Sequence, residues 1–207
     1  LIIPMTAGVM ALSEPVISIV YQRGAFTAFD VSITSRALFF FSLGMFGYGM
    51  QTIISRAFYA EQNGRIPFIA GIVSIIVNVV LCGLLVDRME VAGLALASAI
   101  SSTVYGLALY VPLRKRFRDR DTNHFAGSII KMIFCAAVMT AVIVPMRNAL
   151  WDAGSGLMIK IAVIAVLVIV GMAVYIIMSR IIRLYQAQAA FDFVKNILGR
   201  KRNGTEE

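Results

Sequence analysis

Long apolar runs separated by short polar stretches divide this chain into six segments. The runs occupy roughly residues 1–21, 33–57, 66–86, 91–113, 127–147 and 157–180. A helix of about 20 mostly apolar residues crosses the hydrocarbon core of a bilayer. Backbone polar groups inside that core must pair within the chain, so each run is expected to be helical. The pattern therefore predicts an all-α membrane protein with about six transmembrane helices.

The composition supports membrane insertion and changes how the positive charge is interpreted. The chain has 207 residues, of which 59% are hydrophobic and 14% are charged, and its net charge is +8. Soluble domains are typically about 45–50% apolar and about 25% charged. The basic residues flank the apolar runs, as they do in the cytoplasmic loops of bacterial membrane proteins. We therefore expect membrane lipids, and no nucleic acid, as partners of the charged segments.

Two basic segments determine the expected orientation. The connector 114–126 contains five Lys or Arg residues. The tail 181–207 has apolar residues at three- and four-residue steps and a basic end, which predicts an amphipathic helix on the inner membrane surface. Both segments should face the cytoplasm. The connectors 87–90 and 147–156 would then lie outside, in a multi-pass protein of a bacterial inner membrane with a cytoplasmic C-terminus.

Charged residues also occur inside the apolar runs. Glu14 is a functional candidate because a carboxylate is costly in hydrocarbon, but a position near the outer end of its span also explains it, and we favour that position. The neighbouring Pro15 removes a backbone donor and can kink the helix. Arg56 lies near the predicted cytoplasmic end of its span. We favour a side chain that extends to the headgroups over one that faces a polar cavity.

Asn78 stands in the middle of the third run and requires hydrogen-bond partners there. Serines of the next run, Ser98 among them, can supply these partners across a helix–helix contact. A cation or substrate site between the two spans is the alternative. Gly93, Ala97 and Ser101 recur at four-residue spacing, which predicts that the two helices approach closely.

Glycines are dense in the second run, at Gly44, Gly47 and Gly49. Small residues allow helices to pack closely in membranes. We favour this explanation over a span that bends during a functional cycle. Between the second and third runs, Gly64 predicts a helix end, and Pro67 suits the first turn of the following helix.

The sequence contains no sign of an enzyme. The single histidine, His124, excludes a histidine-based metal cluster, and no glycine-rich nucleotide-binding loop is present. Cys82 and Cys135 lie inside apolar runs and are expected to be packing residues rather than a disulfide. We therefore expect no catalytic residue, no resident metal and no cofactor.

Three motifs follow one another along residues 1–113. VYQRGAFTAFD (20–30) contains Arg23, Gly24, Phe26 and Thr27. ISRAFYAEQNGRIPF (54–68) contains Phe58, Tyr59, Ala60 and Pro67. VAGLALASAISS (91–102) contains Gly93, Leu94, Ala95, Leu96, Ala97 and Ser98. In this order and spacing the motifs resemble those of the MurJ (MviN) family of bacterial lipid II flippases, which belongs to the MOP exporter superfamily.

The resemblance implies an architecture and an activity. Residues 1–113 would be the last four helices of a second six-helix lobe, and residues 127–180 two extra C-terminal helices. The family moves lipid-linked peptidoglycan precursor (lipid II) from the cytoplasmic to the outer leaflet by alternating access. The headgroup would pass through a cationic cavity, and the lipid tail would lie in a groove formed partly by the extra helices. We expect the chain to be a piece of a longer protein, whose N-terminal lobe is its partner.

The resemblance also implies a coupling cation. Some family members hold sodium between the helices that match 66–86 and 91–113. Asn78, Ser98 and the carbonyl of Leu94 fall at the corresponding positions. The carboxylate expected one turn after the asparagine is replaced by Cys82, so the expected site lacks its charged ligand. A coupling cation, Na⁺ or H⁺, is nevertheless an expectation from the family.

Two other functions fit a chain of this kind. One is a polysaccharide-lipid or drug exporter of the same superfamily. The other is a non-transporting membrane scaffold that uses the tail helix 181–207 as a docking surface. The order of the three motifs favours the flippase over both.

Overall fold

The computed structural model describes residues 2–116, 122–151 and 156–182, and all regular elements in these ranges are helices. The elements are α1 (Ile2–Ala11), α2 (Ser13–Tyr21), α3 (Ala28–Ala60), α4 (Arg65–Arg116), α5 (Thr122–Leu150) and α6 (Leu157–Ile181). The predicted all-α membrane fold is confirmed, because these helices follow the apolar runs and the described ranges contain no β-strand.

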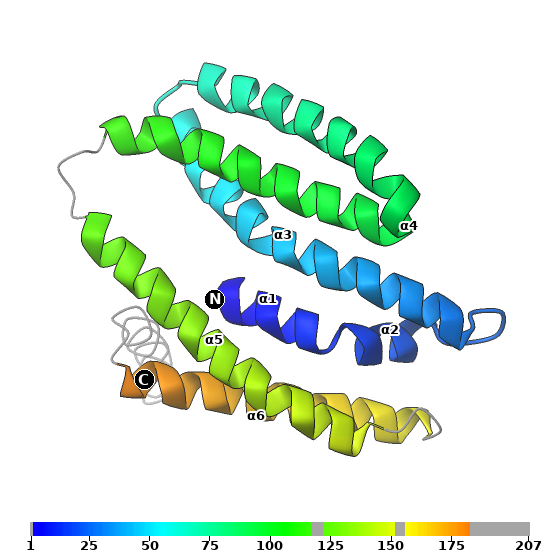
Figure 1. Cartoon of the computed structure of the whole chain (residues 1–207). Helices are drawn as coiled ribbons and strands as arrows, with labels where there is room; N and C mark the ends of the chain where they lie inside the picture. The colour runs from blue at the N-terminus through cyan, green and yellow to red at the C-terminus, as the bar shows by residue number, and fades with distance from the viewer. Residues whose placement is uncertain (1, 117–121, 152–155, 183–207) are drawn as a thin grey trace, which may run out of the picture.

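Helix α4 is a hairpin rather than one straight helix (Figure 1). Glu90 has non-helical backbone angles, φ 51° and ψ −127°, and the chain reverses there. The two arms, 65–89 and 91–116, lie side by side, and the Ser74 hydroxyl donates to the Ser101 carbonyl at 2.8 Å. The reversal lies within the connector predicted at 87–90.

The helices provide the predicted number of membrane crossings. Four helices are long and apolar enough to cross a membrane, or five if the bent pair α1 and α2 is one span. That count takes α4 as a single helix. Because α4 folds back on itself, its second arm adds one crossing to the five, which gives the six that the sequence predicts.

The first apolar run forms two helices instead of one. It breaks at Leu12 into α1 and α2, whose axes diverge by 67°. Pro15 explains the break, because a proline ring crowds the carbonyl four residues earlier and provides no N–H for it. The predicted span over 1–21 is therefore a bent pair of helices, with the kink that Pro15 predicts.

Helix α3 has 33 residues and is therefore about 50 Å long. This length exceeds the hydrocarbon core of about 30 Å, so α3 must tilt or extend beyond it. It ends at Ala60, earlier than the predicted stop at Gly64. The left-handed residue of this turn is Gln62, with φ 55°. Pro67 occupies the first turn of α4, as predicted.

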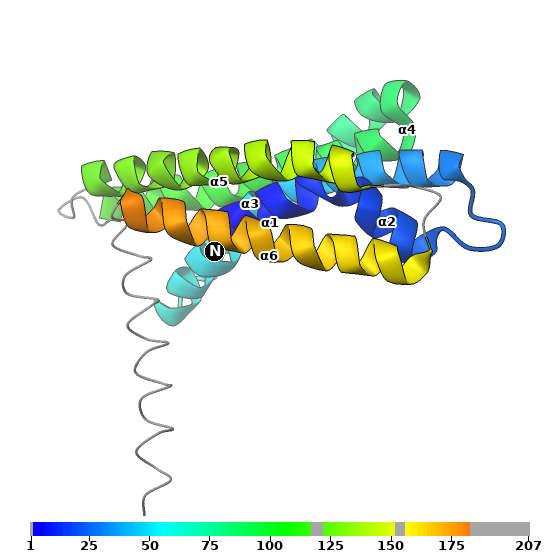
Figure 2. The ribbon, with the colours of Figure 1, turned by 90° about the horizontal axis from the view of Figure 1, so that it is seen from below.

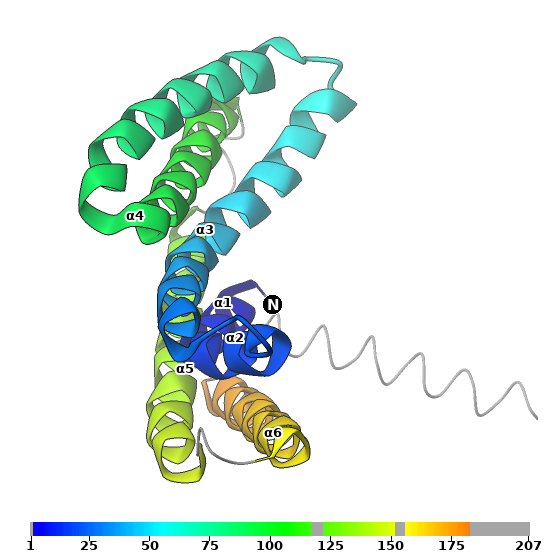
Figure 3. The same cartoon turned by 90° about the vertical axis from the view of Figure 1, so that its right-hand side faces the viewer.

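The helices form successive layers. In Figure 3 the hairpin α4 lies at one side and α6 at the other, with α1 and α2 between α3 and α6. Among the described helices, α4 packs only against α3, whereas α5 packs against α1 and α6. Figure 2 shows α5 and α6 running alongside each other over most of their length.

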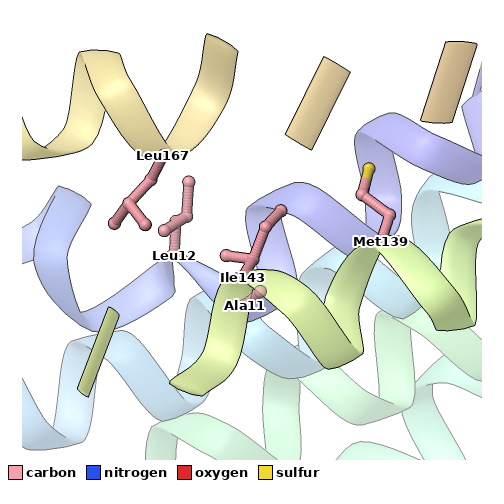
Figure 4. Close-up of a cluster of buried hydrophobic side chains, with 5 residues drawn as sticks. All are labelled: Ala11, Leu12, Met139, Ile143 and Leu167. Carbon is pink, nitrogen blue, oxygen red and sulfur yellow. The ribbon is translucent and has the colours of Figure 1, made fainter. Parts of the chain in front are cut away.

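A buried apolar cluster joins the first span to the last two helices. Its members, shown in Figure 4, are Ala11, Leu12, Met139, Ile143 and Leu167. Each is at most 6% exposed. The α5–α6 pair is therefore attached to the break between α1 and α2, the point at which the first span changes direction.

Parts of the basic segments fall outside the described residues. Helix α4 continues to Arg116 and α5 begins at Thr122, so both helices extend into the connector predicted at 114–126. Arginine and lysine favour helices, which explains the extension of α4. Residues 117–121 lie outside the described ranges, as does the predicted amphipathic tail from residue 183 onward.

Candidate functional site

A cavity of about 1270 Å³ lies between α1, α3 and α5. It forms because α3 and α5 do not pack against each other, although both pack against α1. Apolar side chains dominate its walls, among them Ile3, Met10, Phe39, Phe40, Phe46 and Ile133. Pockets for small molecules are typically about 300–1,000 Å³. The cavity is therefore large enough for a long apolar chain, and we call it the central groove.

One end of the central groove is charged. Glu14, Arg36 and Arg147 all line it, and they come from α2, α3 and α5. They lie at the same end because α1 runs antiparallel to α3 and parallel to α5. Ile2 lies against Gly49, and the Arg147 guanidinium donates to the Ala11 carbonyl at 3.2 Å. The groove thus joins an apolar wall to a mouth with two positive charges and one negative charge.

A second cavity, of about 480 Å³, lies between α2, α3 and the second arm of α4. Phe26 of the first motif lines it, together with Leu94 and Ser98 of the third. The Phe26 ring lies 5.9 Å from the ring of Tyr21, measured between centroids. The first and third motifs, which are distant in the sequence, therefore meet at this cavity.

Asn78 connects the two arms of α4. Its Nδ2 donates to the Ser101 hydroxyl at 3.0 Å and to the Ser98 hydroxyl at 3.5 Å. The Cys82 thiol donates to the Asn78 Oδ1 at 3.6 Å. The Ser101 hydroxyl donates in turn to the Ser98 carbonyl at 3.1 Å. The bonds from Asn78 to the second arm are the helix–helix hydrogen bonding that we favoured for Asn78.

The same four side chains do not fit the cation site implied by the resemblance. The Asn78 nitrogen faces the serines, and its oxygen already accepts from Cys82. Hard cations prefer several oxygen ligands, usually with carboxylates among them. The side chains of Asn78, Cys82, Ser98 and Ser101, which we call the Asn78 node, are all neutral. Among the described residues no cluster of three or more His, Cys, Asp or Glu residues could hold a metal ion.

The first motif builds the turn between α2 and α3. Gly24 has φ 59°, a left-handed conformation that glycine adopts without steric cost. Thr27 caps α3: its hydroxyl accepts from the Asp30 N–H, and the Asp30 carboxylate accepts from the Thr27 N–H at 2.8 Å. Arg23 is exposed. This motif is therefore explained first by local structure.

The second and third motifs also have structural roles. Phe58 is fully buried and packs with Ile54, Ala70 and Leu109, whereas Tyr59 is 59% exposed and Ala60 ends α3. A Cβ on Gly93 would lie 2.5 Å from the Leu85 carbonyl oxygen, so glycine permits the hairpin arms to approach.

The charged candidates of the sequence analysis have different surroundings. Glu14 is exposed at the mouth of the central groove. Arg56 is exposed and lines neither cavity. Arg36 and Arg147 also line the groove, although neither was among the residues predicted from the sequence. Their signal was an arginine within an apolar segment near its predicted outer end, the same kind of signal that pointed to Glu14.

The fold and the central groove define a class: a polytopic α-helical membrane protein with an amphiphilic cavity between its spans. Residues 1–163 match the family model described as lipid II flippase MurJ. The chain belongs to this family, as the three motifs predicted.

Individual relatives agree with the family model. A probable lipid II flippase MurJ of Thermotoga maritima is 30% identical over 188 residues, covering 91% of this chain and 36% of the relative. The lipid II flippase MurJ of Thermosipho africanus is 33% identical over 132 residues, covering 64% and 28%. A solved lipid II flippase MurJ in an inward closed conformation is 28% identical, with a TM-score of 0.71, covering 87% and 36%. The chain thus spans about a third of the length of these proteins.

Proposed function

We propose that this chain forms part of an inner-membrane flippase that moves lipid II from the cytoplasmic to the outer leaflet by alternating access. The proposal rests on membership of the family and on the central groove. The exporter and scaffold hypotheses are not favoured, because the matched relatives are named as lipid II flippases. The first lobe of the whole protein and the lipid II molecule are its proposed partners.

The chemistry of the central groove supports this substrate. A lipid-linked precursor combines a long apolar tail with an anionic, sugar-bearing headgroup. Such a headgroup cannot cross hydrocarbon without a polar path. The groove offers apolar walls for a tail and the guanidinium groups of Arg36 and Arg147 at one end. This pairing of surfaces is the observation that carries the proposal.

The proposed orientation places the charged mouth toward the outside. The connector 114–126 and the C-terminus face the cytoplasm under the positive-inside rule. Asp87 and Arg65 lie at opposite ends of the first arm of α4, and both are exposed. A cysteine introduced at position 87 should react with an impermeant reagent added to intact cells, and one at position 65 should not. Reaction at position 65 alone would reverse the orientation.

The function is tested by measuring lipid II on the outer face of the membrane. In cells depleted of the whole protein, a lipid II-cleaving enzyme added from outside should lose access to its substrate. Expression of the native whole protein should restore access. Ala137→Trp fills the central groove from α5 and should not restore it. The control Phe134→Trp, on the same helix but outside the groove lining, should. Undiminished cleavage after depletion would contradict the proposal.

A further inference from the structure

The break in the first span leaves one backbone carbonyl without its helical donor. Pro15 has no N–H to donate to the Ala11 carbonyl. The bonds on either side persist: the Leu12 N–H donates to the Gly8 carbonyl and the Val16 N–H to the Leu12 carbonyl, both at 3.0 Å. Ala11 is only 6% exposed. An unpaired carbonyl at such a place destabilises the fold unless another group supplies a donor.

Arg147 supplies that donor from the last turn of α5. Its Nη1 donates to the Ala11 carbonyl at 3.2 Å, across 136 positions of sequence. Its Nε and Nη2 donate to the Asn148 Oδ1 at 3.2 and 3.0 Å, which orients the guanidinium plane. The contact is partly buried, and its acceptor Ala11 belongs to the apolar cluster that includes Ile143 (Figure 4).

We infer that Arg147 is a positioning residue that caps the broken first span and fixes α5 to its bend. We call this Arg147–Ala11 contact the latch. Since Glu14 and Arg147 both line the mouth of the central groove, the latch sets how α2 and α5 flank that mouth. Because Ala11 is the last residue of α1, movement of this end of α1 away from α5 requires the latch to open. Its consequence for transport rests on the proposed function, but the latch itself does not.

The geometry allows a test in which one substitution makes the other redundant. Pro15→Ala provides a backbone N–H for the Ala11 carbonyl, so the guanidinium is no longer needed there. Arg147→Met keeps the length of the side chain and removes its donors, whereas Arg147→Lys keeps one donor. The angle between α1 and α2 can be followed by the distance between nitroxide labels at the exposed positions Met5 and Val20.

In the whole protein, Arg147→Met should broaden the label distribution, because the end of α1 is then no longer held to α5. Arg147→Lys should stay near the native distribution. With Pro15→Ala present, Arg147→Met should produce no further change. An unchanged distribution in Arg147→Met would overturn the latch, and so would an equal effect with and without Pro15→Ala.

A milder variant keeps the inference falsifiable if Arg147→Met does not fold. Asn148→Ala removes only the two bonds that orient the guanidinium, and Asn148 is exposed. It should broaden the distribution slightly in the native background and not at all beside Pro15→Ala. No broadening in either background would overturn the latch. The distances do not depend on transport, so their failure leaves the proposed flippase activity standing, and failure of the lipid II assay leaves the latch standing.

Discussion

The backbone nitrogen of Thr103 lies 2.6 Å from the point where a Cβ on Gly47 would stand. A Cβ on Gly44 would similarly stand 2.8 Å from the Ala99 Cα. Helix α3 and the second arm of α4 therefore touch backbone to backbone along this face. Membrane helices associate through such small-residue contacts, because lipid supplies no hydrophobic drive between them. Gly44 and Gly47 are thus explained by packing against α4, and Gly49 by packing against Ile2 of α1.

This contact predicts the effect of Gly47→Ala. The added methyl group meets backbone atoms that cannot move locally, so overpacking should cost about 1–3 kcal/mol of stability. The measurement is the thermal unfolding midpoint of the purified whole protein in detergent. Gly83→Ala is the matched control, because nothing lies within 4 Å of its Cβ. Equal midpoints for the two variants would show that the close contact is not present.

The turn before α3 predicts a second pair of variants. Gly24 has φ 59°, and its Cβ would meet no neighbour, so only backbone strain opposes substitution. Gly24→Val should destabilise by about 1–2 kcal/mol, whereas Gly24→Asn should cost less because asparagine tolerates this conformation. Thermal unfolding again measures the difference. Equal losses for valine and asparagine would argue against a left-handed residue here.

The number of crossings was predictable because it depends on one-dimensional information. The lengths of the apolar runs and the polar residues at 87–90 are visible in the sequence, and bilayer thickness converts them into helices. The serine partners of Asn78 were predictable for a similar reason. They lie on the adjacent arm of a short hairpin, so few pairings were available.

The central groove was not predictable in the same way. It depends on α3 and α5 both packing against α1 while remaining apart, which no local pattern specifies. The Arg147–Ala11 contact joins residues 136 positions apart. Pro15 predicted a kink, but not the 67° bend or the residue that satisfies the freed carbonyl. Tertiary packing decided these features.

The Asn78 node predicts a modest loss of stability in Asn78→Leu. Hydrogen bonds between membrane helices contribute about 0.6 kcal/mol on average and about 1.7 at most. Ser101→Ala removes the partner at 3.0 Å and should cost a similar amount. The double variant should cost less than the sum of the two, as measured by unfolding in detergent. Strict additivity would show that the two side chains do not interact.

Cys82 predicts how the protein responds to sodium. With neutral side chains at the node, replacing sodium by potassium should leave the unfolding midpoint unchanged. Cys82→Asp adds a carboxylate one turn from Asn78 and should make the midpoint rise with sodium concentration, because a bound cation stabilises the folded state. Cys82→Asn is the uncharged control. A sodium-dependent midpoint in the native protein would contradict the geometry of the node.

The central claim, that the central groove holds the lipid tail, is tested most directly by photo-crosslinking. Ile133 and Phe134 are neighbours on α5 with 54% and 55% exposure, but only Ile133 lines the groove. A photoreactive residue at each position of the whole protein can be irradiated in membranes containing radiolabelled lipid II. We predict several-fold more lipid II adduct from position 133 than from position 134. Equal adduct at both positions would contradict the account.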